Sequence, residues 1–129
     1  MTCASNLAVA AFLCFGFGAS GALAQEQVER KQLQTSEWPV GYNTTTITAT
    51  FKPNGFLPRH SHPGVENGYV LEGELVLKID GKADLKMKPG DSWIVPANTP
   101  HSATGGPAGS TVLVTYVVDK TKPLASPAP

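Results

Sequence analysis

The stretch GFLPRHSHPGVE, residues Gly55–Glu66, is the most informative part of this sequence. It holds two of the three histidines in the sequence, His60 and His62. Residues two apart on an extended strand point to the same face, so both imidazoles lie on one side. The Pro-Gly pair that follows turns the chain, and Glu66 can then bring a carboxylate back toward the same point.

The third histidine, His101, follows the turn-rich stretch 96–100 and could supply a further imidazole to this point. Three neutral imidazoles and one carboxylate suit a divalent transition metal such as Zn, Cu, Fe or Ni, and Mn tolerates the same mixture. An H-x-H pair alone fits two surface residues as well as two ligands. The specificity of the pattern comes from the surrounding glycines and prolines.

These glycines and prolines give the sequence a resemblance to the two motifs of the cupin family. The H-x-H, the three-residue gap to Glu66 and the six-residue gap to Gly73 match the first motif. The second is present as Gly90, then Pro96 after five residues, then His101. Its usual glycine is Asn98 here, and asparagine tolerates the left-handed backbone that such a turn needs.

The resemblance implies a small all-β jelly-roll barrel, also called a double-stranded β-helix. It further implies that one divalent transition metal (Fe, Mn, Ni, Zn or Cu) is bound by four side chains inside the barrel: His60, His62, Glu66 and His101.

The rest of the chain independently favours an all-β fold. From Thr44 onward, Gly or Pro interrupts the sequence so often that long helices are excluded, and β-branched residues fill the intervals. Strands are predicted at residues 44–51, 69–71, 92–95 and 111–118, with a loop at the glycine-rich residues 105–109. Such short strands without helices indicate an antiparallel sandwich or small barrel.

Residues 74–87 predict a β-hairpin around Asp80 and Gly81. A two-residue loop would pair Leu75 with Lys86, so that the apolar residues of the two strands would not lie on the same face. A three-residue loop, 79–81, with Gly81 left-handed, avoids this mismatch. The predicted pairs are then Leu77–Ala83, Leu75–Leu85 and Glu74–Lys86.

The chain divides into four predicted parts. Residues 1–24 carry no charged side chain, contain an apolar run at Leu7–Phe17 and end in Ala-Leu-Ala, which predicts a secretion signal cut before Gln25; an uncleaved anchor is the alternative. Residues 25–43 form an N-terminal arm, extended or a short helix, and residues 44–118 form the cupin barrel. The Pro-rich residues 119–129 are predicted to be a disordered tail.

Export would place the mature chain in the periplasm or outside the cell, without disulfides, because both cysteines (Cys3 and Cys14) precede the cut. No membrane association is expected after cleavage. The formal net charge is zero, with 10 basic and 10 acidic residues, so no basic surface predicts nucleic-acid binding.

Further residues near the motifs have two interpretations each. Arg59 could hold an anionic substrate, or it is a solvated charge on the face opposite His60. The aromatic side chains could line a pocket, although packing in the core is their commoner role. This second set comprises Phe51, Phe56, Tyr69, Trp93 and Tyr116.

Three functions remain open at this point. The first is a metal-dependent enzyme, like a dioxygenase, isomerase or decarboxylase, that acts on a small organic molecule, since four protein ligands leave up to two positions of an octahedral ion open. The second is a non-catalytic periplasmic protein that binds a metal or a small ligand. The third is a structural barrel that works through self-association, and a homodimer is compatible with all three.

Overall fold

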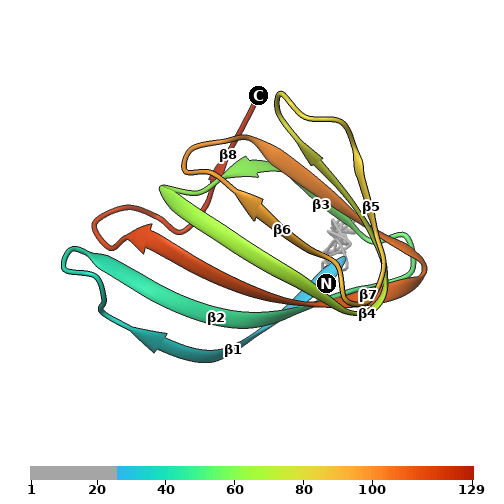
Figure 1. The fold of residues 1–129 in the computed structure, drawn as a ribbon, viewed down its shortest axis with the longest axis horizontal. Coiled ribbons are helices and arrows are strands. Elements are labelled where there is room, and N and C mark those ends of the chain that lie inside the picture. Colours follow the sequence, from blue (N-terminus) through green and yellow to red (C-terminus); the bar gives the residue numbers. More distant parts are fainter. Residues whose placement is uncertain (1–25) are drawn as a thin grey trace, which may run out of the picture.

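The computed structural model describes residues 26–129, and in that range the chain forms strands and no helix (Figure 1). The predicted all-β class is therefore confirmed. The strands are β1 Val28–Ser36, β2 Tyr42–Phe51, β3 Phe56–Ser61, β4 Gly64–Ile79, β5 Leu85–Met87, β6 Ser92–Val95, β7 His101–Asp119 and β8 Ser126–Pro127. The predicted signal peptide lies outside the described residues. Within them, no helix of a length and apolarity suited to crossing a membrane is present.

The two longest strands, β4 and β7, organise the sheet. Its order is β1-β2-β7-β3-β8, and β4 pairs with β5, β6 and β7. The second half of β7 pairs with β2 and with the first half of β4, while its first half pairs with β3 and the end of β4. All these pairings are antiparallel, and because the two halves of β7 pair with different strands, the long strands extend through both parts of a sheet that wraps around one core (Figure 1).

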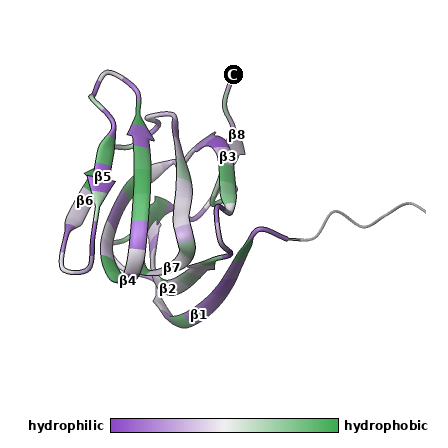
Figure 2. Cartoon of the chain, turned by 90° about the vertical axis from the view of Figure 1, so that its right-hand side faces the viewer, coloured by the Kyte–Doolittle hydropathy of each residue, from purple (hydrophilic) through white to green (hydrophobic). Residues whose placement is uncertain are grey.

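The core follows from alternation along these strands. Every second residue from Leu75 to Ile79 and from Val112 to Val118 is buried, because successive side chains of a strand point to opposite faces. Val70 is fully buried in the same core. Strand β1 lacks this pattern: only Val28 is buried, and Figure 2 shows the strand as largely hydrophilic, as expected for an edge of the sheet.

At two places where the sequence predicts the end of a strand, the strand continues in the structure. Strand β4 runs through Gly73, and β7 runs through residues 105–109, where a loop was predicted. Gly73 and Gly109 both have positive φ, and a Cβ on Gly73 would lie 2.1 Å from the carbonyl oxygen of Gly109. The glycines therefore form a bulge that bends both strands without ending them, a distinction that the sequence pattern does not make.

The predicted hairpin register is wrong by two residues. The structure pairs Leu75 with Met87 and Leu77 with Leu85, so the apolar faces match as expected, but Ala83 is exposed in a longer loop. The reason lies outside the hairpin: Ile79 is paired with His101 of β7 and stays in the strand, and its carbonyl accepts from Lys82 N–H to close a turn that begins only there. Gly81 does adopt the predicted positive φ, as does Asn98 before His101.

The two flanking segments are both part of the sheet. The arm is extended, and its residues Val28–Ser36 pair with β2. The tail, predicted to be disordered, instead pairs with β3 through β8, and Ala128 N–H donates to the carbonyl of Arg59. An unpaired edge of β3 offers the partners, and prolines lower the entropy that the tail loses on ordering. Composition alone shows only the polar, Pro-rich character of the tail.

Substitution of Leu77 by alanine should lower the free energy of unfolding by about 2–5 kcal/mol, because this side chain is 1% exposed and leaves a cavity. Leu71→Ala is the matched control on the same strand, at 42% exposure, and should cost no more than about 0.5 kcal/mol. Urea denaturation of both variants, in the presence of a chelator, measures the difference. Equal losses would contradict the assigned faces of β4.

Candidate metal centre

The four predicted ligands come from three strands and one turn but meet at one point inside the barrel. His60 lies on β3, Glu66 on β4 and His101 at the start of β7, while His62 lies between β3 and β4. His60 and His101 are directly opposed in the β3–β7 ladder, and opposed residues share a face. One ligand atom from each of the four residues lies within 4.8 Å of the others.

Backbone carbonyls orient all three imidazole rings in the same way. The Nδ1–H groups of His60, His62 and His101 donate to the carbonyls of Pro58 (2.7 Å), Leu124 (2.7 Å) and Thr99 (3.0 Å), respectively. These bonds fix the tautomer of each neutral ring, because a proton held at Nδ1 leaves Nε2 with a free lone pair. The arrangement is that of imidazoles prepared to bind a cation through Nε2.

The carboxylate of Glu66 is oriented by an indole. Trp93 Nε1–H donates to Glu66 Oε1 at 2.8 Å, and Oε2 lies 3.0 Å from His62 Nε2 and 3.3 Å from His101 Nε2. Trp93 stands opposite Gly68, where a Cβ would lie 1.9 Å from the ring. Glycine at this position is therefore what allows the indole to reach the carboxylate.

Burial and neighbouring groups determine where protons reside in the site. Burial raises the pKa of Glu66, but the interactions with His101, His62 and Trp93 outweigh it, and the pKa lies well below the usual value. Burial also lowers the pKa of His101, and here the hydrogen bond and charge of Glu66 outweigh it, so the pKa is raised above 6.5. Burial and the neighbouring imidazoles lower the pKa of His60. Without a metal, a proton is therefore best held by His101, next to the Glu66 carboxylate.

One buried atom shows that the residues fit a metal ion. His62 Nε2 has no hydrogen-bond partner, although it lies 3.0 Å from Glu66 Oε2, because with the ring proton at Nδ1 both atoms present lone pairs to each other. A buried polar atom without a partner is costly, and a cation shared by Nε2 and Oε2 would satisfy both lone pairs. Three imidazoles and one carboxylate are a donor set suited to a divalent transition metal.

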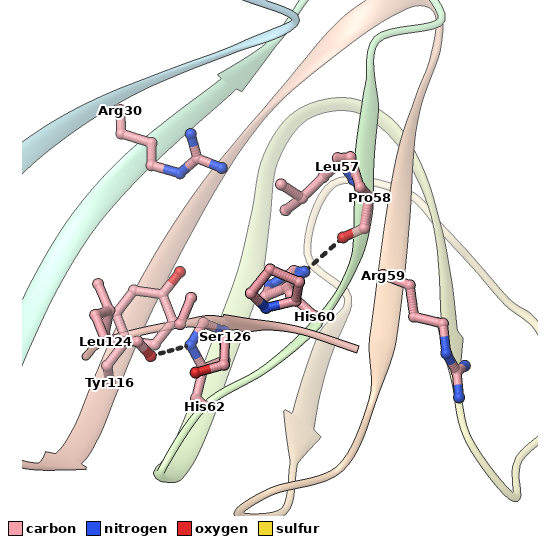
Figure 3. Close-up of a pocket in the computed structure, with 11 residues that line it drawn as sticks. Arg30, Leu57, Pro58, Arg59, His60, His62, Tyr116, Leu124 and Ser126 are labelled. Carbon is pink, nitrogen blue, oxygen red and sulfur yellow. Dashed lines mark hydrogen bonds between the residues drawn. The ribbon is translucent and has the colours of Figure 1, made fainter. Parts of the chain in front are cut away.

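A cavity of about 310 Å³ opens beside His60 and His62 (Figure 3). Its walls are mainly apolar, with Leu57, Pro58 and Leu124 among them, and Tyr116 packs against His62 with ring centroids 4.7 Å apart. Burial raises the pKa of Tyr116 and the Glu66 charge adds to this, while the charge of Arg30 acts in the opposite direction. A small, largely apolar space therefore leads to the cluster beside His60 and His62.

Arg59 and the aromatic residues singled out in the sequence differ in how close they lie to the four predicted ligands. Arg59 forms an ion pair with Asp80 and also donates to the Pro129 carbonyl, and its side chain extends away from His60 (Figure 3). Phe51 is in the core as expected, whereas Phe56 and Tyr69 are 51% and 44% exposed and pack in neither core nor pocket.

Two participants were missed by the sequence analysis. The Leu124 carbonyl, which holds His62, has no sequence signature because every residue carries one. Arg30, which lines the cavity, lies in the arm, whose sequence has no motif.

Glu66→Gln should lower the pKa of His101 below that of the unaltered chain, because the carboxylate is what raises it against the effect of burial. The raised pKa also stabilises the metal-free fold below pH 6.5, and this contribution is lost as the pH rises through the folded pKa. NMR titration of the three histidine rings in chelator-treated protein measures the change. An unaltered His101 titration would contradict the assigned hydrogen bond.

Removal of residues 123–129 should make the Nδ1–H proton of His62 exchange rapidly with water, because the Leu124 carbonyl that accepts it is lost. The Nδ1–H proton of His101 is the internal control, since its acceptor Thr99 remains. Proton NMR of the metal-free full-length and shortened chains measures both signals. If both remain protected after truncation, the tail does not hold His62.

Comparison with known proteins agrees with this architecture. A family model described as the cupin domain matches residues 47–117. The 3-hydroxyanthranilate 3,4-dioxygenase of Mycosarcoma maydis is 36% identical over 86 residues, which are 64% of this chain and 45% of that protein. The chain thus spans less than half the length of this relative.

Solved structures share the fold. The DMSP lyase DddQ from Ruegeria pomeroyi matches with a TM-score of 0.71 and 19% identity, over 91% of this chain and 59% of that one. An RmlC-like cupin from Desulfovibrio desulfuricans matches with a TM-score of 0.60 and 28% identity, over 83% and 97%. The double-stranded β-helix expected from the motifs is confirmed, and this chain belongs to the cupin family.

Proposed function

We propose that this chain is a metal-dependent enzyme that binds one divalent transition metal through His60, His62, Glu66 and His101 and acts on a small organic molecule. The observation that carries the proposal is the buried convergence of three Nε2 atoms and a carboxylate beside a cavity. In a purely structural barrel, the buried His62 Nε2 without a hydrogen-bond partner would be destabilising and would have no compensating role.

A dioxygenase is the reaction class that we favour. The support is the relative in Mycosarcoma maydis, named as a 3-hydroxyanthranilate 3,4-dioxygenase and 36% identical over the aligned residues. The site is compatible with this class, since four protein ligands leave up to two positions of an octahedral ion for other molecules. An isomerase or decarboxylase would use the same ligands.

Each residue of the site has a defined task in this proposal. His60, His62 and His101 present Nε2, and their backbone partners hold the rings in place. Trp93 keeps Glu66 Oε1 occupied, so that Oε2 faces the imidazoles. The cavity beside His60 and His62 admits the substrate and limits its size. The metal, when bound, would supply Lewis-acid and template chemistry, or oxygen activation if it is redox-active.

We also propose that the chain is exported, on the support of the uncharged, apolar N-terminal residues and the Ala-Leu-Ala sequence before Gln25. The protein purified for the experiment below should accordingly be the chain from Gln25 onward.

The chain should contain about one transition-metal ion, and His62→Ala should abolish this stoichiometric binding while leaving the barrel folded, because it removes a buried ligand at the edge of the core and leaves the β4–β7 ladder in place. Ser61→Ala, at the neighbouring position, is the matched control and should retain the metal. Elemental analysis of protein prepared without chelators or a histidine tag measures the content. Unchanged metal in His62→Ala would disprove the ligand assignment.

The loaded protein should then consume oxygen with 3-hydroxyanthranilate or a related hydroxylated aromatic acid. Tight metal retention without turnover of any small organic molecule would favour the alternative of a non-catalytic binding protein.

A further inference from the structure

Arg30, on β1, is a charged side chain that faces the cavity beside the metal cluster. Its guanidinium points into the space between Leu57, His60 and Tyr116 (Figure 3). It also lines the deeper, smaller cavity of about 30 Å³ that reaches Glu66 and His101 inside the barrel. Arg30 is therefore at the mouth of the site, although it lies thirty positions before the first histidine ligand in the sequence.

The charge of Arg30 is only weakly paired within the described part of the chain. Its partners are Glu26, at 3.3 Å and 74% exposed, and the Val28 carbonyl, also at 3.3 Å. An exposed pair with a single contact is worth little in water. Arg59, the other arginine at this cavity, differs in that both of its terminal nitrogens bind Asp80. Of these two cations, Arg30 is the one that can exchange its partner for a ligand.

The surroundings favour an anion of limited size. No carboxylate is among the described residues that line the larger cavity, so a cationic group would find no partner there. A divalent ion held by three neutral imidazoles and one carboxylate leaves a net positive charge beside Arg30. The volume of about 310 Å³ is at the lower end for small-molecule pockets, and the apolar walls suit a hydrocarbon or aromatic body.

We propose that Arg30 is a substrate-binding residue that pairs with a carboxylate, and that the ligands of this site are small organic carboxylates with an apolar body. This inference rests on the proposed function and adds the substrate class to it. The planar guanidinium can donate two parallel hydrogen bonds to one carboxylate, which fixes the orientation of the ligand as well as its charge.

The experiment compares benzoate with benzamide, which have the same body and differ in the charged group. Isothermal titration of each into zinc-loaded protein gives the ratio of their affinities. Arg30→Gln should reduce this ratio by about tenfold, mainly through weaker benzoate binding. Lys31→Gln is the control, because it removes the same charge from the neighbouring, exposed position of β1 and should leave the ratio unchanged.

The outcomes separate this inference from the proposed function. Zinc content is measured for each protein, so loss of the metal site is seen directly. If zinc binds but the benzoate-to-benzamide ratio is the same in Arg30→Gln as in the unaltered chain, Arg30 does not bind the carboxylate and the inference fails while the metal site stands. An equal fall in Lys31→Gln would also overturn it, because the effect would then be one of overall charge. Should zinc fail to bind, the same titrations of the metal-free protein still test Arg30.

Discussion

The ionised carboxylate of Glu66, 5% exposed in the middle of an apolar barrel, is the constraint on which the site depends. An isolated charge in such a place is very costly unless neighbouring groups compensate it. Trp93 donates to one oxygen, and two imidazoles face the other. A proton on His101 offsets part of the charge, whereas the buried His62 Nε2 has no hydrogen-bond partner. This arrangement of one carboxylate and three imidazoles is complementary to a cation.

The long strands β4 and β7 make this arrangement possible. Their ladder places Ile79 opposite His101 at one end and Glu66 opposite Tyr116 toward the other, on either side of two register shifts, so the same two strands position groups on both sides of the cluster. The bulge at Gly73 and Gly109 bends both strands and closes the sheet over the core. The hydrogen bonds between β4 and β7 therefore both close the barrel and position residues of the candidate metal site. The three imidazole rings are in turn held by their Nδ1–H bonds to backbone carbonyls, so their orientation does not depend on a ligand.

Segments outside the residues matched by the family model complete the open side of the site. The tail supplies the carbonyl that holds His62 and part of the apolar cavity wall. The arm supplies Arg30, on a strand that is otherwise hydrophilic and adds little to the core. This division is physically reasonable, since a core tolerates few changes of shape, whereas edge strands can vary without loss of stability.

Residue spacing alone predicts an all-β chain with His60 and His62 on one face, and the resemblance to the cupin motifs implies the complete set of four converging residues. Glycine and proline spacing excludes helices, the two-residue period puts His60 and His62 on one side, and the gap to Glu66 follows from the turn; all of these are local properties that the backbone imposes. Four features could not be predicted from local sequence patterns and follow from the tertiary structure: the hairpin register, the continuity of β4 through Gly73, the ordering of the tail and the placement of Arg30. Each of these depends on a pairing between residues far apart in the chain: Ile79 with His101, Gly73 with Ser110, the tail with β3, and β1 with β2. A local sequence pattern does not identify these distant pairing partners, because the free energy that selects them arises only when the whole sheet forms.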